Sequence, residues 1–214
     1  MPEFTLYYSP GACSLAPHLA LEEVGADFEP VRVNLAGGEQ RQPAYLAVNP
    51  KGRVPALVRG DWVLTENPAI LGFIARRFPA AGLWPEEPDA AARLAEWLAW
   101  MSSTVHVAYA HVRRPDRYAD GEAARAEVVA RGRETARDVW NQVERRIGAG
   151  PWALGERMSV ADPYLMVFWT WGRGPTLGFD MAADFPHWTA HARRLAERPA
   201  VRRVFEREGL TLPA

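Results

Sequence analysis

Apolar and polar positions alternate in two different ways along the chain. Over residues 1–80, short runs of β-type composition alternate with helical patterns, whereas residues beyond 88 show helical periodicity alone. The β-type runs are 4–8, 28–33, 56–58 and 62–64. A turn of Arg59, Gly60 and Asp61 joins the last two runs and predicts an antiparallel hairpin. The change of period predicts two domains.

Two helices are expected in the first domain, because apolar residues recur there at helical spacing. Their apolar stripes are Ala16, Leu19, Ala20 and Val24 in the first helix, and Ile70, Phe73 and Ile74 in the second. Gly25 stands where a helix C-cap is expected, and Pro79 follows the second helix. A right-handed crossover makes the first two strands parallel. The element order β-α-β, then β-β-α, therefore predicts an α/β layer fold with a small mixed sheet.

A proline-rich segment separates the two patterns. Residues 79–88 contain three prolines and one glycine, which predicts an irregular linker. Three apolar stripes at helical spacing follow, and a helical bundle is their natural packing. The stripes are Leu94, Trp97, Leu98, Met101 and Val105; Ala136, Val139, Trp140, Val143 and Ile147; and Val160, Tyr164, Val167, Phe168 and Trp171. We expect an α/β domain at 1–80, a linker at 81–88 and an all-helical domain at 89–214.

Composition excludes several classes of function. The 214 residues carry a net charge of −1 with Lys and Arg spread along the chain, which argues against a nucleic-acid binder. No apolar run approaches the roughly 20 residues that span a bilayer, and the first residues do not resemble a signal peptide. The expected location is therefore the cytoplasm. A single cysteine, Cys13, excludes a disulfide within the chain and a metal site built from several cysteines.

Cys13 is the first candidate for chemistry. It stands in the segment 9–14 (SPGACS), between the first strand and the first helix, so we expect it near a helix N-terminus. Unpaired N–H groups and the helix dipole favour a thiolate at such a position. A lone cysteine is as often a small buried hydrophobe, and position alone leaves both interpretations open. The neighbouring hydroxyls are rival candidates that helix caps and core aromatics explain equally well: Ser9, Ser14, Tyr7 and Tyr8.

Two further segments carry groups that could bind a peptide-like ligand. In residues 49–57 (NPKGRVPAL), a cis Val54–Pro55 bond would expose the Val54 N–H and C=O to an added strand, although the trans form is commoner. Where the second helix begins, backbone N–H groups at Asn67 can hold a carboxylate while Glu66 holds an ammonium. A plain helix N-terminus with an acidic first turn explains the same two residues.

A capping box is predicted at residues 159–162 (SVAD). Ser159 and Asp162 stand three residues apart before an apolar helix, so that each can pair with an otherwise unpaired N–H group. We expect these two residues to serve folding and not catalysis.

Taken in order, these segments resemble glutathione transferases, the bacterial beta class in particular. The segments are 9–14, 49–57, Thr65-Glu66 with Ala69-Ile70, and 159–162, and the resemblance covers nearly the whole chain. The resemblance implies a thioredoxin-like first domain followed by the all-helical domain. It also implies a homodimer that uses glutathione as co-substrate, with no other cofactor and no metal.

The resemblance assigns roles to residues of the first domain. Pro55 is cis, and Val54 pairs with the cysteinyl backbone of glutathione. Glu66 and the N–H of Asn67 bind the γ-glutamyl end. Cys13 matches the beta-class cysteine that lies beside the glutathione sulfur.

The helical domain contributes the rest of the implied site. His106 matches the histidine that the beta-class site draws from this domain, although a lone histidine is more often a surface or hydrogen-bonded residue. Tyr109, Tyr118 and Trp171 are candidates for the electrophile pocket, and Trp171 matches an aromatic of the beta-class cleft. All three aromatic side chains could equally belong to the core.

The sequence departs from the beta-class pattern at Gly38, Asn67, Ala99 and Val107. Because the lysine common after the second strand is missing, Arg41 or Lys51 is left to hold the glycyl carboxylate. The reaction implied by the resemblance is conjugation of glutathione to small apolar electrophiles. A mixed disulfide at Cys13 would instead support thiol–disulfide exchange or peroxide reduction. The departures favour a different alternative, a non-catalytic ligand-binding or interaction protein with the same fold.

Overall fold

A mixed four-stranded sheet forms the centre of the first domain. The computed structural model describes residues 2–213. The strands are β1 (Phe4–Tyr8), β2 (Phe28–Arg32), β3 (Ala56–Arg59) and β4 (Trp62–Thr65), in the order β2-β1-β3-β4. β1 and β2 are parallel, with Phe4 opposite Phe28, whereas β3 is antiparallel to both β1 and β4. The predicted mixed sheet and its hairpin are confirmed.

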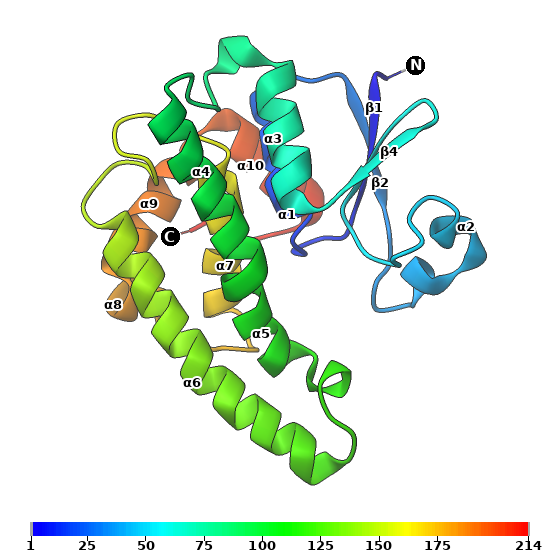
Figure 1. Cartoon of the computed structure of the whole chain (residues 1–214), viewed down its shortest axis with the longest axis vertical. Coiled ribbons are helices and arrows are strands. Elements are labelled where there is room, and N and C mark those ends of the chain that lie inside the picture. Colours follow the sequence, from blue (N-terminus) through cyan, green and yellow to red (C-terminus); the bar gives the residue numbers. More distant parts are fainter. Residues whose placement is uncertain (1, 214) are drawn as a thin grey trace.

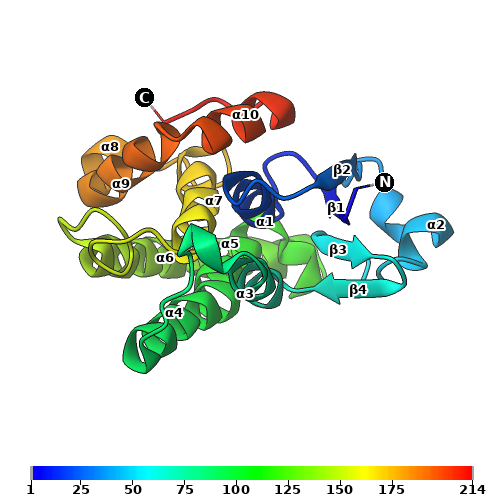
Figure 2. The same ribbon diagram turned by 90° about the horizontal axis from the view of Figure 1, so that it is seen from above.

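Helices cover both faces of this sheet. α1 (Leu15–Glu23) and α3 (Asn67–Arg77) lie on one face and α2 (Pro43–Leu46) on the other (Figure 2). The 3₁₀ turns η1 (Glu39–Arg41) and η2 (Pro79–Ala81) precede α2 and follow α3. α2 and η1 are not predicted from the sequence, because a single turn is too short for apolar periodicity to show.

The second domain is all-helical, with α6 as its longest helix (Figure 1). Its elements are α4 (Pro88–Trp100), the π-helical turn η3 (Met101–Val105), α5 (His106–Arg113), η4 (Pro115–Arg117), α6 (Glu122–Ile147), α7 (Ala161–Arg173), α8 (Met181–Asp184), α9 (Pro186–Ala196) and α10 (Pro199–Glu208). The stripe that was predicted at 94–105 is therefore split between α4 and η3. Within residues 2–213, no helix is long and apolar enough to cross a membrane. The domain boundary at 81–88 stays a prediction.

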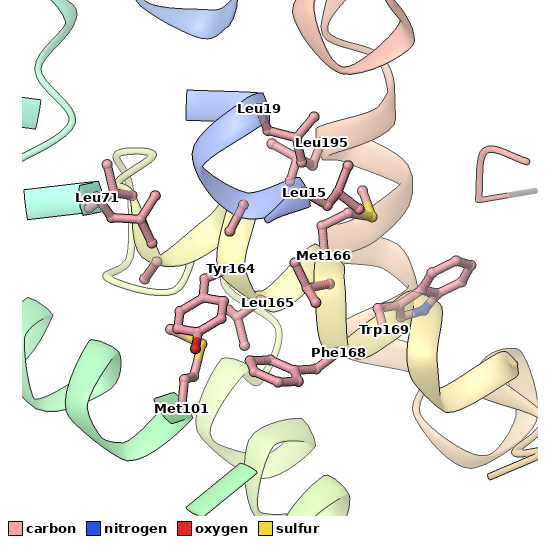
Figure 3. Close-up of a cluster of buried hydrophobic side chains, with 14 of the residues drawn as sticks. Leu15, Leu19, Leu71, Met101, Tyr164, Leu165, Met166, Phe168, Trp169 and Leu195 are labelled. Atoms are coloured by element: carbon pink, nitrogen blue, oxygen red, sulfur yellow. The ribbon is translucent and has the colours of Figure 1, made fainter. Parts of the chain in front are cut away.

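Helix α7 lies at the centre of the hydrophobic core that both domains share. Residues 161–169 of α7 and residues 15–21 of α1 are all buried. Side chains of both helices meet in this core, with Leu15 and Leu19 on one side of α7 and Met101 on another (Figure 3). A helix that is apolar all round requires burial on every side. The two domains therefore pack as one unit around α7.

The predicted capping box begins this central helix. Ser159 Oγ accepts a hydrogen bond from Ala161 N–H at 3.3 Å, and Asp162 Oδ2 accepts one from Ser159 N–H at 2.7 Å. The other carboxylate oxygen, Oδ1, binds Ala153 N–H at 2.8 Å and His191 Nε2 at 2.7 Å. Asp162 is fully buried. Through these hydrogen bonds it joins Ala153, Ser159 and His191, and it also caps α7.

The two capping residues should differ in their effect on stability. Ser159→Ala should lower the free energy of unfolding by about 0.5–2 kcal/mol. Asp162→Ala should cost more, because each buried partner left unpaired costs about 1–3 kcal/mol. Denaturant unfolding measures both variants, with Thr135→Ala on an exposed helix face as the control. A loss of turnover at unaltered stability would show that these residues belong to the active site.

Candidate active site

The loop between β1 and α1 places Cys13 beside Val54. The Cys13 thiol donates a hydrogen bond to Val54 C=O, with 3.4 Å between Sγ and O. The Val54–Pro55 peptide bond is cis, and both Val54 and Pro55 are buried. The structure thus brings together the predicted thiol and the predicted peptide-binding segment, which lie 41 residues apart in the sequence.

Of the two interpretations that position leaves open for Cys13, the structure favours the uncharged, partly buried thiol. Burial raises the pKa of the Cys13 thiol to about 11, although the Cys13 backbone N–H and the side chain of Asn67 lower it in part. α1 begins at Leu15, so Cys13 precedes the first helical turn. Loss of water around the sulfur outweighs the favourable N–H groups. Cys13 is therefore a neutral thiol at pH 7.

Two residues of the helical domain hold the backbone of the Cys13 loop at Gly11. Trp171 Nε1 donates to Gly11 C=O at 2.8 Å, and Glu208 Oε2 accepts from Gly11 N–H at 2.8 Å. Glu208 Oε1 also lies 2.6 Å from His18 Nδ1, and both side chains are fully buried. Sequence reasoning missed His18 and Glu208. A histidine among the apolar residues of α1 was the available signal, since a buried polar side chain requires a partner.

Glu66 and Asn67 lie where α3 begins, next to the Cys13 loop. Glu66 is exposed, has a positive φ of 72°, and pairs with Lys51 at 2.7 Å between Nζ and Oε1. Asn67 is buried, and its Nδ2 donates to Cys13 C=O at 3.0 Å. Its Oδ1 has no hydrogen-bond partner within the described residues. Lys51 was a candidate for binding the glycyl carboxylate of glutathione. Its ion pair with Glu66 instead places it where the γ-glutamyl end of glutathione is predicted to bind.

The side chains of His106, Tyr109 and Trp171 contact one another and form one continuous aromatic wall. Trp171 stacks on Tyr109 with ring centroids 4.2 Å apart, and the His106 ring lies 5.0 Å from Trp171. Burial, together with the positive charges of Arg53 and Arg117, lowers the pKa of His106 to about 4. The imidazole is therefore neutral at pH 7. Because Trp171 also binds Gly11, this aromatic wall adjoins the Cys13 loop.

The other candidate residues lie outside this group. Ser9 is buried, and its N–H donates to Ser14 Oγ at 3.0 Å, which is a structural contact of the loop. Tyr118 is 44% exposed and packs on His111, with ring centroids 4.1 Å apart, instead of joining Trp171. Within residues 2–213, no group of three or more His, Cys, Asp or Glu side chains could hold a metal ion.

Comparisons with known proteins agree with this architecture. Residues 2–76 match the family model "Glutathione S-transferase, N-terminal domain", and residues 99–199 match "Glutathione S-transferase, C-terminal domain". Glutathione S-transferase GstA of Escherichia coli O157:H7 is 33% identical over 209 residues, which cover 96% of this chain and 98% of that protein.

Solved structures give the same result. A glutathione transferase homolog from Sulfitobacter with bound glutathione has a TM-score of 0.91 and 41% identity, covering 99% of this chain and 100% of its own. A bacterial beta class glutathione S-transferase from Sphingomonas chungbukensis has a TM-score of 0.83 and 36% identity, covering 97% of this chain and 100% of its own. The fold is that of the glutathione transferases. This chain belongs to the glutathione S-transferase family, whose members are enzymes that use glutathione as co-substrate.

Alkylation tests the protonation state of Cys13, because the protein has no other thiol. With a thiol pKa of about 11, the rate of reaction with iodoacetamide should rise about tenfold per pH unit between roughly pH 7 and pH 10 without levelling off. The chain unfolded in urea is the control and should level off near the ordinary cysteine pKa of about 8.5. Intact mass measures both reactions. A folded-state plateau below about pH 8.5 would contradict the neutral thiol.

Proposed function

We propose that this protein conjugates glutathione to small apolar electrophiles, with the glutathione sulfur between Cys13 and the aromatic wall. The observation that carries the proposal is the stack of Trp171 on Tyr109, joined to the Cys13 loop through Gly11. A flat apolar surface next to a thiol-binding position suits an aromatic electrophile. The Val54 backbone next to Cys13 can pair with the cysteinyl part of glutathione as an added strand.

Neutral donors stabilise the glutathione thiolate in this proposal. At pH 7 Cys13 keeps its S–H proton and His106 is an uncharged imidazole with one ring N–H. The His106 ring N–H can donate a hydrogen bond to a nearby thiolate sulfur, and the Cys13 S–H can do so by turning away from Val54 C=O. The thiolate then attacks the electrophilic carbon, a sulfur–carbon bond forms, and the leaving group departs with the electron pair of the broken bond. Glu66 and the Asn67 N–H hold the γ-glutamyl end.

The protonation state of Cys13 favours conjugation over thiol–disulfide exchange. Because burial raises the pKa of the Cys13 thiol to about 11, the thiolate is a minor form at pH 7. Exchange and peroxide reduction both need that thiolate as nucleophile. These two activities are therefore expected to be slow compared with conjugation.

We also propose a cytoplasmic homodimer, as the beta-class resemblance implies. Apolar side chains on the edge strand support an interface, since Trp62 and Val63 are 38% and 40% exposed. The two side chains point to opposite faces of β4, and an exposed apolar edge strand is typical of surfaces that meet another chain.

Glu66 is expected to be required for binding glutathione. Glu66→Ala should abolish retention on glutathione resin, because no other acidic side chain at the start of α3 can hold the γ-glutamyl ammonium. The thermal transition should stay nearly unchanged, since Glu66 is exposed. Glu86→Ala removes an exposed acid elsewhere and serves as the control. Unchanged retention of Glu66→Ala would overturn the assignment.

Cys13 and His106 should be separable by their variants. Cys13→Ala should keep measurable conjugation but lose any mixed disulfide with oxidised glutathione, which intact mass detects. His106→Ala should lower the turnover number by about 10²–10⁴-fold and leave the KM for glutathione nearly unchanged. Because burial lowers the pKa of His106 to about 4, wild-type turnover should show no His106 inflection between roughly pH 5 and pH 8. His187→Ala, on an exposed histidine, is the control.

Two results would contradict these roles. A glutathione adduct that persists in Cys13→Ala would show that the thiol assignment is wrong, because the variant contains no thiol. A His106→Ala variant with full turnover would remove His106 from the sulfur site.

A further inference from the structure

The last turn of α10 carries a buried carboxylate that contacts the loop of Cys13. Glu208 is the final residue of α10, and its side chain is fully buried. Its two carboxylate oxygens bind different groups. Oε1 lies 2.6 Å from His18 Nδ1, and Oε2 accepts a hydrogen bond from Gly11 N–H at 2.8 Å. α10 lies against α1 (Figure 2), so one side chain joins the end of α10 both to α1 and to the loop two residues before Cys13.

Arg207 fixes the direction of the hydrogen bond between His18 and Glu208. A guanidinium group can only donate, and Arg207 Nη1 lies 3.1 Å from His18 Nε2. The Nε2 atom must therefore accept, which places the ring proton of the imidazole on Nδ1. His18 thus donates from Nδ1 to the carboxylate, and Arg207 holds His18 in this tautomer.

Local preferences disfavour a carboxylate at position 208. Glu208 lies in the C-terminal turn of α10, where the helix dipole disfavours a negative charge. Burial of the carboxylate costs free energy as well, and a buried ionic pair often gives no more stability than apolar side chains of similar volume. Proteins depart from such preferences mainly at functional sites. The acceptor for Gly11 N–H is the one contribution that an apolar side chain at this position would not replace.

The helical domain holds Gly11 from three sides. Its N–H binds Glu208 and its C=O binds Trp171, and a Cβ at this position would lie 3.4 Å from Leu210 Cδ2. Gly11 has a positive φ of 68°, which favours glycine. These contacts set the orientation of the peptide groups on both sides of Gly11. Two residues later the Cys13 N–H acts on its own sulfur, so the same stretch of backbone determines where this donor points.

We propose that Glu208 is a positioning residue for the sulfur site. Through Gly11 N–H it fixes the backbone of residues 11–13, and His18 in turn fixes Glu208. The inference rests on the proposed conjugation, in which the reacting sulfur of glutathione lies beside Cys13. Loss of the Glu208 contact displaces the loop, and a displacement of about 1 Å near a reacting centre lowers the rate by up to about 10²-fold. The γ-glutamyl end binds at the start of α3, outside this hydrogen-bonded group, so the affinity for glutathione changes little.

Glu208→Gln tests the role of the carboxylate. An amide side chain has one acceptor oxygen but faces two donors, so either His18 or Gly11 loses its partner. The kcat for 1-chloro-2,4-dinitrobenzene should fall about tenfold per folded molecule, with the KM for glutathione within about twofold of the wild type. Alkylation of Cys13 by iodoacetamide should become about tenfold faster, because loss of a hydrogen bond to a charged group makes opening of the loop easier. Glu206→Gln, on an exposed carboxylate of the same turn, is the matched control.

Two variants of His18 test the same role with the carboxylate intact. Asparagine and leucine side chains have nearly the same shape, but only the asparagine amide offers an N–H donor in the place of the imidazole Nδ1. His18→Leu should therefore reproduce both effects of Glu208→Gln, whereas His18→Asn should stay closer to the wild type. Denaturant unfolding of each variant gives the folded fraction by which its rates are divided.

The measurements separate a positioning role from a purely structural one. A lower free energy of unfolding in Glu208→Gln, with unchanged kcat and unchanged alkylation of Cys13, would overturn the inference. Equal kcat and alkylation rates in His18→Leu and His18→Asn would overturn it as well. If the wild type does not turn over the aryl chloride, the proposed conjugation fails, and alkylation alone decides the positioning of Cys13. Faster alkylation in Glu208→Gln and His18→Leu, but not in His18→Asn, then supports the role, and equal rates refute it.

Discussion

The packing of α1 against the buried helix α7 determines the geometry of the whole site. α1 follows the loop that carries Cys13, and α7 ends near Trp171, so one core contact sets the distance between the thiol and the aromatic wall. The hydrogen bond from Trp171 to Gly11 then fixes the loop against the wall. Because close-packed cores deform little, the two halves of the site hold one arrangement although they come from different domains.

Burial also sets the charge state of Cys13 and His106, the two groups that we propose lie beside the glutathione sulfur. It raises the pKa of Cys13 to about 11 and lowers the pKa of His106 to about 4. The directions are opposite because burial disfavours the charged form of each group, a thiolate in one case and an imidazolium in the other. Both groups are thus neutral donors at pH 7. A site of this kind stabilises the charge of a ligand without adding a charge of its own.

The sequence predicted what depends on local pattern. The four strands, the hairpin, the cap of α7 and the cis bond at Pro55 follow from periodicity, turn residues or the family resemblance, and the structure confirms them. The sequence left the charge state of Cys13 open and did not predict the pair of His18 with Glu208, which are 190 residues apart. The charge state of Cys13 and the contact of His18 with Glu208 depend on which distant segments surround each side chain. The spacing of apolar residues along the chain carries no information about those neighbours. The roles of the site residues stay predictions.

The net charge of −1 conceals two different uses of arginine. Arg198, just before α10, and Arg203 and Arg207 within it pair with Glu22 and Glu23 of α1 and join the two domains. Near His106, Arg53 of the first domain and Arg117 of the second have no ion pair within the described residues, and their charges add to burial in lowering the pKa of the imidazole. The arginines near His106 thus act on the charge state of the imidazole, whereas those that face α1 connect the two domains.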